Sequence, residues 1–409
     1  MRAPVLTRRL VAGGAILAAL AVIPAAPAAS AAAGRAAPKT VPAVISWGDN
    51  DQGELGNGTT TSSSTPVYVS VPASQRFTTV RSGRAGFAVS ASGRLYAWGL
   101  NASGQLGDGT TTSRLRPERI RLPAGVRLKT VRAGVGFALA LTAGGKMLAW
   151  GYNGDGALGT GSTANHHQPV WVRLPAGVKV TAISAGYNSS LALTSTGRVL
   201  SWGDGNEGQL GDGARTRREL PGYVRLPKHT KIKSIAAGNA NGYAVTTAGR
   251  LLAWGFGGYG QLGDGTVTNQ LTPVFARLPR GVKVLAVAPG VIHALALTTG
   301  HKVLAWGNNT DGQLGTGTTA SRSTPVRVKL PPGTKASALA GGQFFSMALT
   351  SAHHILAWGQ NSRGELGDGT TTDRLLPGRV HLPPGFTPTL IGAGFDSQSP
   401  LASGRQVPD

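Results

Sequence analysis

The chain of 409 residues has a formal net charge of +23 at pH 7, with 40 Lys and Arg residues against 17 Asp and Glu residues. It contains no cysteine, which excludes a thiol nucleophile, a thiolate metal site and stabilisation by disulfide bonds. Apolar residues make up 41% of the chain, which is enough for a large core. The positive charge indicates either a solvated Arg-rich surface or a surface that binds anionic polymers or nucleic acid.

The N-terminal segment, residues 1–31, has the features of a secretory signal. Basic residues precede a short apolar stretch, and small residues supply a cleavage site; the stretch is too short to span a membrane comfortably as a helix. These parts are, in order, Arg2, Arg8 and Arg9, the run from Leu10 to Ile23, and Ala29-Ser30-Ala31. We therefore predict an exported protein without a membrane span, secreted or associated with the cell envelope. The paired arginines leave both Sec and twin-arginine export open.

Residues 32–42 are typical of a linker, and from residue 43 the chain is periodic. The dipeptide Trp-Gly occurs seven times, at a spacing of 51 residues once and 52 residues five times, and a Gly-x-Leu-Gly core follows each copy. A fixed period near fifty residues indicates a repeat architecture. The tryptophans are Trp47, Trp98, Trp150, Trp202, Trp254, Trp306 and Trp358.

The repeat over residues 129–181 predicts four short β-strands. Apolar and polar residues alternate over 129–133, 137–142, 146–150 and 169–174, with Gly or Pro after the runs. Successive short strands mostly pair as an antiparallel meander, and seven such sheets arranged radially form a β-propeller. A proline at the start of each fourth run lacks an N–H group and fits an edge strand. These prolines are Pro66, Pro117, Pro169, Pro221, Pro273, Pro325 and Pro377.

The two ends of the repeat region predict how the ring closes. The chain enters at a third-strand run, Val44 to Trp47, and leaves after a second-strand run, Ser397 to Leu401. The N-terminal strands can therefore complete a blade begun by the C-terminal strands. We predict an all-β fold, a monomeric seven-bladed β-propeller of four-stranded antiparallel blades over residues 43–402, with a short tail at 403–409.

Two recurring residue types have structural explanations. The Trp is expected to fill the space between adjacent sheets. The Gly-Asp-Gly pieces are compatible with calcium, but other copies place Asn57, Thr160 or Thr316 there, and no further carboxylates follow at the spacing of a calcium loop. Asp-Gly turn chemistry explains them better, so we predict neither a metal nor a cofactor. The aspartates are Asp108, Asp212, Asp264 and Asp368.

These residues resemble the regulator of chromosome condensation repeat family, whose unit combines Ala-Gly, a His, Ala-Leu-Thr, Gly, Trp-Gly and Gly-Gln-Leu-Gly. The resemblance covers nearly all of residues 43–402 and implies a seven-bladed propeller; the Gly-Gly signature of kelch propellers does not recur. Two well-matched copies contain Ala185-Gly186, Ala192-Leu193-Thr194, Gly197, Trp202-Gly203 and Gly208-Gln209-Leu210-Gly211, and then Gly290, His293, Ala296-Leu297-Thr298, Trp306-Gly307, Asn309 and Gly312-Gln313-Leu314-Gly315.

The chain departs from that family in two respects. The recurring His is present only at His293, and Phe137, Ser189, Asn241, Phe345 and Ser397 replace it elsewhere. The repeats are of nearly constant length, without the protruding insertion that members with nucleotide-exchange activity use on a small GTPase. Exchange activity therefore becomes an alternative by family analogy only. Some exported bacterial propellers of similar blade type are protein inhibitors that use loop aromatics on one face.

The turn after the first strand and the loop after the third strand of a meander reach the same face of a blade. Large side chains that vary between copies gather in these segments, and aromatic residues on a rigid rim are good interface anchors. We predict that this face binds a protein partner, with the alternative that some rings pack between blades. The candidate partner-binding residues are Phe137, Tyr152, Tyr187, Phe256, Tyr259, His293, Phe344, Phe345 and Phe395.

Charge is sorted along each repeat. Acids gather in the loops after Trp-Gly, whereas many bases lie in the fourth strand and the connection after it, which indicates a basic underside or rim able to bind an anionic cell-envelope polymer. Nucleic acid is a weaker candidate because aromatic and basic residues are not interleaved. The bases are Arg121, Arg127, Lys129, Arg173, Lys179, Arg225, Lys228, Lys231, Lys233, Arg277, Arg280, Lys283, Lys329 and Lys335.

The sequence gives little support for catalysis. The adjacent pairs His166-His167 and His353-His354 would point to opposite sides of a strand, and no nucleophile elbow or phosphate-binding loop occurs. We therefore predict a non-enzymatic binding protein, with inhibition of an extracellular or envelope enzyme as one role that fits. The alternative from another class is a lyase or hydrolase that acts on polysaccharide in the central funnel.

Overall fold

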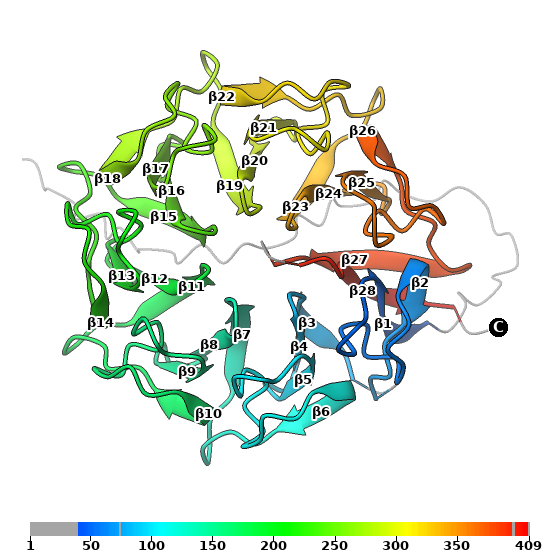
Figure 1. Cartoon of the computed structure of the whole chain (residues 1–409), viewed down its shortest axis with the longest axis horizontal. Helices are drawn as coiled ribbons and strands as arrows, with labels where there is room; N and C mark the ends of the chain where they lie inside the picture. Colours follow the sequence, from blue (N-terminus) through cyan, green and yellow to red (C-terminus); the bar gives the residue numbers. More distant parts are fainter. Residues whose placement is uncertain (1–39, 73–74, 395–396, 408–409) are drawn as a thin grey trace, which may run out of the picture. The chain divides into compact units, whose positions relative to one another are not determined.

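The computed structural model describes residues 40–72, 75–394 and 397–407, which form one all-β unit. Within these residues, 28 strands form seven four-stranded sheets, and every strand pair is antiparallel, as in β13 (Val199–Gly203) with β14 (Arg218–Tyr223). Figure 1 shows the sheets as blades around a central axis, with β3, β7, β11, β15, β19, β23 and β27 innermost. The predicted seven-bladed propeller is confirmed.

In six of the blades the chain runs from the innermost strand to the outermost. Blade 1 contains β3 (Phe77–Arg81), β4 (Ala85–Ser90), β5 (Leu95–Gly99) and β6 (Arg114–Ile120); blade 2 contains β7 (Leu128–Ala133), β8 (Phe137–Thr142), β9 (Met147–Gly151) and β10 (His166–Trp171). Blade 3 contains β11 (Val180–Ala185), β12 (Ser189–Thr194), β13 and β14; blade 4 contains β15 (Ile232–Ala237), β16 (Asn241–Thr246), β17 (Leu251–Gly255) and β18 (Gln270–Phe275). Blade 5 contains β19 (Val284–Pro289), β20 (His293–Thr298), β21 (Val303–Gly307) and β22 (Arg322–Arg327); blade 6 contains β23 (Ala336–Gly341), β24 (Phe345–Thr350), β25 (Ile355–Gly359) and β26 (Arg374–Arg379).

Blade 7 joins the two ends of the propeller. Its order is β27 (Phe386–Gly392), β28 (Leu401–Gln406), β1 (Val41–Gly48) and β2 (Ser63–Tyr68), with β1 paired to β28. The innermost strands contact their neighbours all round the axis, including β27 with β3 and β23. The ring is therefore closed by its terminal strands, as predicted.

The sheet is longer at both ends than the sequence indicated. Val41 and Pro42, expected in the linker, pair with Gln406 and Arg405, which were expected in the tail. The second strand of blade 7 starts at Leu401, and Ser397 precedes it in the turn. This register places Ser399, not Ser397, at the position of Phe137, because Gln398 O and Gly136 O accept equivalent hydrogen bonds from Asp49 N and Tyr152 N. The expected signal, residues 1–31, and residues 32–39 of the linker lie outside the described residues.

The recurring proline lies within the outermost strand, not at its start. In β10, His166 pairs with Gly151 and Val170 pairs with Ala149, so the strand is irregular around Pro169. An outermost strand tolerates a residue without an N–H group at such an irregularity.

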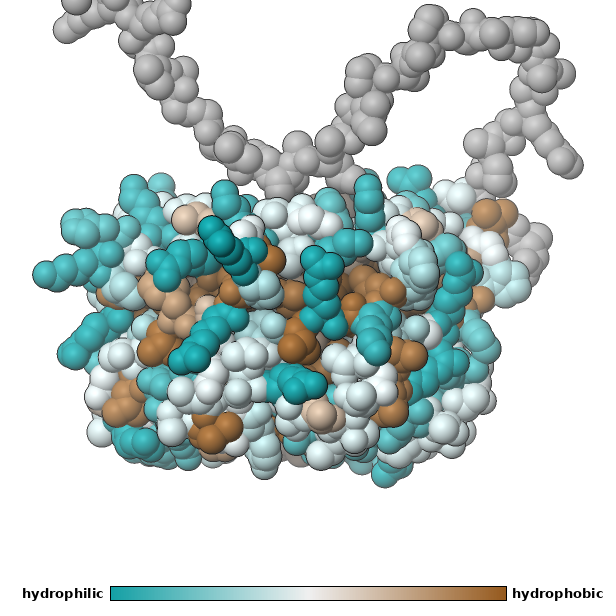
Figure 2. Space-filling model, turned by 90° about the horizontal axis from the view of Figure 1, so that it is seen from above, coloured by the Kyte–Doolittle hydropathy of each residue, from teal (hydrophilic) through white to brown (hydrophobic). Residues whose placement is uncertain are grey.

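Figure 2, which looks onto the side where β22 lies, shows apolar patches crossed by hydrophilic side chains. In blade 4 the guanidinium of Arg250 lies 3.3 Å from the ring centroid of Phe275, which belongs to the outermost strand.

Each blade is joined to the preceding one through its tryptophan. All seven indoles of the Trp-Gly pairs are fully buried, and each Nε1 donates to a backbone carbonyl in the preceding Gly-x-Leu-Gly core, as Trp150 does to Gln105 O at 2.8 Å. The second glycine of that core lies against the ring, because a Cβ on Gly107 would lie 2.7 Å from Trp150 Nε1. Trp-Gly and Gly-x-Leu-Gly are therefore the two sides of one joint between blades.

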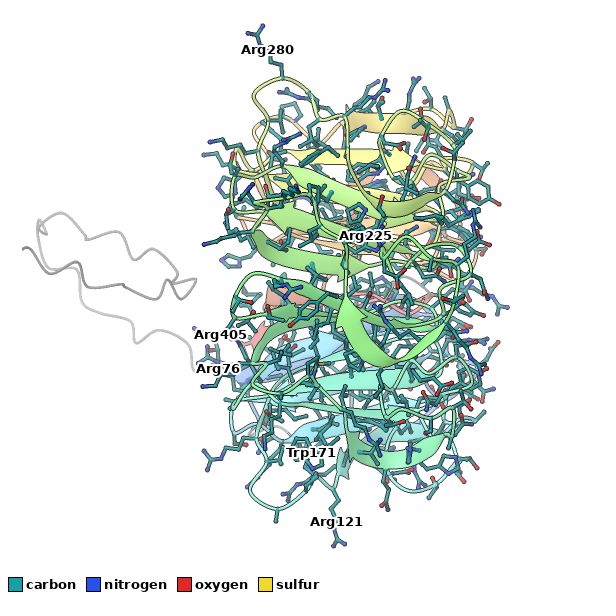
Figure 3. All side chains as sticks on the ribbon, turned by 90° about the vertical axis from the view of Figure 1, so that its left-hand side faces the viewer. Arg76, Arg121, Trp171, Arg225, Arg280 and Arg405 are labelled. Carbon is teal, nitrogen blue, oxygen red and sulfur yellow. The ribbon has the colours of Figure 1, made fainter. Side chains whose placement is uncertain are left out.

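The connections between strands form two faces. The turns between first and second strands meet the loops between third and fourth strands, as shown by Tyr152 N, which donates to Gly136 O at 2.8 Å; we call this side the loop face. The turns between second and third strands and the connections between blades form the opposite side, which we call the turn face. In Figure 3, Arg76 and Arg405 lie on the turn face at the left, whereas oxygen atoms gather at the right, on the loop face. No helix of the described residues is both long and apolar enough to cross a membrane.

Candidate partner-binding surface

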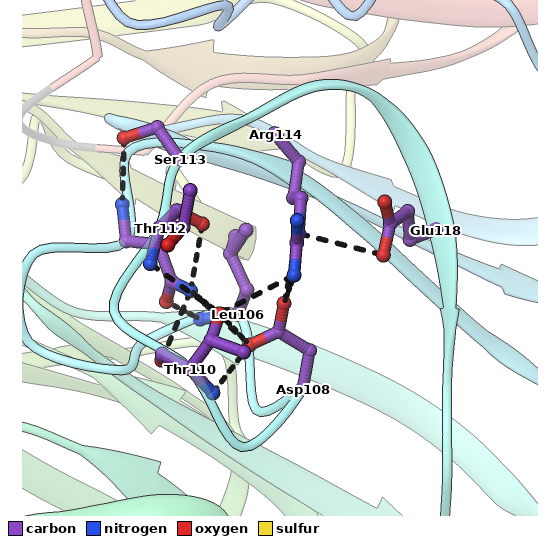
Figure 4. A network of polar contacts seen from close by, with 8 residues as sticks. Leu106, Asp108, Thr110, Thr112, Ser113, Arg114 and Glu118 are labelled. Carbon is purple, nitrogen blue, oxygen red and sulfur yellow. Dashed lines mark hydrogen bonds and ion pairs between the residues drawn. The ribbon is translucent and has the colours of Figure 1, made fainter.

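The loops after Trp-Gly are held by internal hydrogen bonds, shown for blade 1 in Figure 4. Asn101 Oδ1 accepts from Leu106 N at 2.9 Å, and its Nδ2 donates to the carbonyl of Thr110 at 3.1 Å. Asp108 accepts from Thr110 N at 2.9 Å and from Arg114 Nη2 at 2.7 Å. The loop face is therefore built from loops whose shape is fixed before any partner binds.

The same network accounts for the recurring Gly-Asp-Gly pieces. Partial burial alone would raise the pKa of Asp108, but hydrogen bonds from Thr110 and Arg114 outweigh it, so the pKa lies below its ordinary value. The charged carboxylate is thus committed to its own loop. In the part of the chain that the structure describes, no three His, Asp or Glu side chains are grouped to hold a metal ion.

Three of the nine predicted contact residues are buried and cannot reach a partner directly. Phe137, His293 and Phe345 are each 1% exposed. Each is the first residue of a second strand, and its ring lies against a glycine three residues before it. A Cβ on Gly134 would overlap Phe137, and Gly290 and Gly342 lie in the same way against His293 and Phe345. The variable position was expected on the surface, but it continues the buried side of the strand.

His293 illustrates what this internal position requires. Its Nε2 lies 2.9 Å from Ser346 Oγ of the next blade, and the Ser346 hydroxyl lies 2.8 Å from Gln313 O, to which it donates. Burial lowers the pKa of His293 to about 3, so the imidazole is neutral at physiological pH. The residue thus contributes to the joint between blades 5 and 6.

The other predicted residues differ in exposure. Tyr187 and Tyr259 are 46% and 47% exposed, and Tyr152, Phe256 and Phe344 are half-buried. Phe256 and Tyr259 pack edge to face, with ring centroids 5.9 Å apart. Phe395 lies outside the described residues. The aromatic part of the loop face therefore consists of two exposed tyrosines and three half-buried rings.

Tyr187 borders a hollow of about 280 Å³ at the centre of the loop face. Backbone hydrogen bonds from Val135 N to Tyr187 O and from Tyr187 N to Asn239 O connect the turns of successive blades around it. The sequence did not single out Arg84, Val135, Gln343 or Gln398 here. The signal was available, because Val135, Tyr187 and Gln343 each follow the glycine that comes directly after a first strand. The lining residues are Asp49, Glu54, Gly83, Arg84, Val135, Tyr187, Gln343, Gln398 and Ser399.

The hollow carries both signs of charge. Burial raises the pKa of Glu54, and the nearby charge of Asp49 raises it further, whereas Arg84 acts in the opposite direction. Asp49 also lies 3.6 Å from Arg363 of the neighbouring blade. A hollow with a tyrosine, an arginine, carboxylates and amides is suited to recognise a polar segment of another protein.

The turn face has the opposite composition. Of the described Asp and Glu residues, none lies in a turn between second and third strands or in a connection between blades, where basic residues are frequent. Blade 6 is different, because its turn and the connection to blade 7 contain His353, His354 and His381 and no Lys or Arg. The bases of these segments are Arg76, Arg94, Arg121, Arg127, Lys146, Arg173, Lys179, Arg198, Arg225, Lys228, Lys231, Arg250, Arg277, Arg280, Lys283, Lys302, Lys329 and Lys335.

Comparisons with known proteins agree with this architecture. A family model described as the RCC1-like domain matches residues 43–398. The ultraviolet-B receptor UVR8 of Arabidopsis thaliana is 32% identical over 336 residues, which cover 82% of this chain and 76% of the receptor. The E3 ubiquitin-protein ligase HERC2 of Homo sapiens is 33% identical over 294 residues, 71% of this chain but only 6% of the ligase. Yeast RCC1, solved with bound Kap60, has a TM-score of 0.80 at 21% identity over 90% of each chain, which shows a shared fold.

Proposed function

Because this chain belongs to the family of RCC1-like domains, we propose that it is an exported, non-enzymatic propeller that binds a protein partner through its loop face. The observation that carries the proposal is the exposure of Tyr187 and Tyr259 on loops that are held in place by their own hydrogen bonds. Aromatic side chains on a rigid support bind at low entropic cost.

The chemistry of the loop face supports binding more than catalysis. Several of the described acids there are engaged within their own loops, as Asp108 is with Thr110 and Arg114. The buried His293 is neutral and hydrogen-bonded to Ser346. The half-exposed tyrosines and the hollow beside Tyr187 instead offer anchors and polar complementarity. A propeller of this kind inhibits a secreted or envelope enzyme if the bound segment includes that enzyme's active-site rim.

Affinity capture from secreted and envelope fractions tests the loop face. The purified protein is compared with a Tyr187→Ala/Tyr259→Ala variant and with Trp171→Ala, which removes a ring of similar exposure (45%) from the outermost strand of blade 2. A partner recovered by wild type and by Trp171→Ala, but reduced at least about tenfold with the double variant, supports the proposal. Equal recovery with all three proteins contradicts it.

The charge of the turn face favours a second interaction, with an anionic polymer of the cell envelope. Clustered bases without described acids create a positive field that salt screens. We expect retention on phosphocellulose to fall steeply with added NaCl, and to fall further in Arg280→Gln/Lys283→Gln. The matched variant Arg215→Gln/Arg217→Gln, on the loop face, should lose much less. Retention that is insensitive to salt would rule this interaction out.

Export rests on residues 1–31 and is tested directly by the mature N-terminus. We expect the protein outside the cytoplasm to begin close to Ala32, after cleavage of the signal. Intact protein that accumulates only in the cytosol would refute export and restore regulation of a cytosolic GTPase as the alternative.

A further inference from the structure

The innermost strands place seven equivalent residues around the central axis. In six blades this residue pairs with the third residue of the second strand, as Arg132 does with Leu139, and in blade 7 Gly392 pairs with Leu401, the first residue of β28. All seven line an axial cavity of about 340 Å³. Five of them are small, and two adjacent blades contribute arginine. In blade order they are Arg81, Arg132, Ser184, Ala236, Ala288, Ala340 and Gly392.

The two guanidinium groups use only part of their hydrogen-bonding capacity. Arg81 donates from Nη1 to Val80 O at 2.7 Å. Arg132 donates from Nη1 to Thr130 Oγ1 at 2.8 Å and to Val131 O at 2.9 Å. Neither Nε nor Nη2 of these arginines bonds to a described residue. Since a guanidinium has five N–H groups, each arginine keeps donors available to the channel.

No described residue that lines the cavity provides a negative charge to balance them. No Asp or Glu is among its lining residues, and neither arginine forms an ion pair with a described carboxylate. Both side chains are half-exposed to a channel that protein surrounds. Removal from bulk water inside the channel lowers the pKa of Arg81 to about 10. The same effect, together with the charge of Arg81, lowers the pKa of Arg132 well below its ordinary value.

We propose that Arg81 and Arg132 form the cationic side of a binding site for a small free oxyanion, a phosphate or a carboxylate, on the propeller axis. Planar guanidinium groups bind such anions through paired N–H donors. Ser184 adds a hydroxyl donor in the next blade, because its Oγ already accepts from Ala237 N at 2.9 Å and its own proton bonds to no described residue. The small residues of blades 4 to 7 leave space opposite the arginines.

The repeat itself indicates that these arginines are not needed for the fold. Blades 4, 5 and 6 have alanine at the same position, at Ala236, Ala288 and Ala340. The variant Arg81→Ala/Arg132→Ala therefore copies a side chain that the architecture already accepts, and it also removes the repulsion between two like charges. We expect the variant, without added anion, to be at least as stable as wild type.

Calorimetric titration with inorganic phosphate tests the site, with citrate as a second arm and NaCl at matched ionic strength as the background. Wild type should bind at least one of the two anions saturably. Arg81→Ala/Arg132→Ala should raise the Kd at least about tenfold, and Arg280→Ala, which removes an outer arginine of the turn face, should leave it unchanged. Preference for one titrant distinguishes phosphate from carboxylate as the natural ligand class.

The stability of the same proteins provides an independent readout. Phosphate or citrate should raise the Tm of wild type and of Arg280→Ala relative to chloride, but not that of the double variant. The proposal is overturned if wild type binds neither anion, or if the double variant binds as tightly as wild type. Both measurements are independent of the protein partner, so their failure leaves the loop-face proposal standing.

Discussion

Glu365 lies in the Gly-x-Leu-Gly core of blade 6, at a position where four other blades have Gln. Its side chain is fully buried; Oε2 accepts from Arg363 N at 2.8 Å, and Oε1 has no partner. Burial raises its pKa from 4.5 to about 7, and the nearby charges of Asp373 and Asp49 act in the same direction. Replacing Glu365 by Gln therefore removes a titration that depends on folding.

The sign and size of the effect follow from linkage. The folded state holds the proton more tightly than the unfolded state, so stability falls as pH rises from about 4.5 to about 7 and is level above that range. A shift of this size corresponds to a loss of about 3 kcal/mol at pH 8. Glu365→Gln should avoid this loss, because an amide does not titrate and its oxygen can still accept the hydrogen bond from Arg363 N. Gln313, the equivalent residue of blade 5, accepts such a bond from Asp311 N at 3.0 Å.

Urea unfolding at pH 5 and pH 8, followed by tryptophan fluorescence, measures this difference. We expect Glu365→Gln to be close to wild type at pH 5 and more stable by about 2–3 kcal/mol at pH 8. The reciprocal variant Gln313→Glu should introduce the same pH dependence into blade 5. A stabilisation by Glu365→Gln that is equal at both pH values would refute the reasoning.

Three further predictions concern the joints and loops. Gly107→Ala should lower the free energy of unfolding by about 2–5 kcal/mol, because φ is +79° and the added Cβ would meet Trp150. Gly125→Ala should lower it by only about 1–2 kcal/mol in the same urea assay, because φ is +73° but nothing lies within 4 Å of the added Cβ. Equal losses would contradict the packing of Gly107 against Trp150. Trp150→Phe should cost about 2 kcal/mol or more, because Gln105 O loses its donor, and a neutral result would show that the bond is dispensable. Asp108→Asn should reduce stability at pH 7 but not near pH 2. The lowered pKa means that the charged carboxylate stabilises the fold at pH values above the pKa of the unfolded chain, and this contribution disappears as the pH falls and the carboxylate is protonated. An effect that is the same at both pH values would be inconsistent with this.

The fold was predictable because Gly or Pro residues mark the ends of the strands in each repeat. Gly and Pro separate the runs, Trp-Gly sets the period, and the phase of the two ends requires the shared blade in which β1 pairs with β28. The positions of single residues within that frame were less accessible. Pro169 lies in the middle of β10 because the strand is irregular there, which alternation alone does not reveal.

The candidate site was predictable only in part. Phe137 was placed on the surface because its position varies between copies, yet it begins β8, in which all six residues are buried, and lies on the same side of the strand as Leu139 and Leu141. The residue at this position contacts the neighbouring blade and not a partner, as His293 does with Ser346. Tyr187 was found because it lies in the turn after a first strand, where residues vary between copies. The structure places it half-exposed beside the hollow of the loop face.

Site-specific photo-crosslinking tests the central claim, that the loop face binds a protein partner, most directly. Benzoylphenylalanine is placed at position 187, at position 259 and, as the control, at position 171 on the outermost strand of blade 2. We predict that positions 187 and 259 cross-link the same protein from the secreted or envelope fraction and that position 171 does not. The same cross-linked products from all three positions, or a product from position 171 alone, would contradict the account.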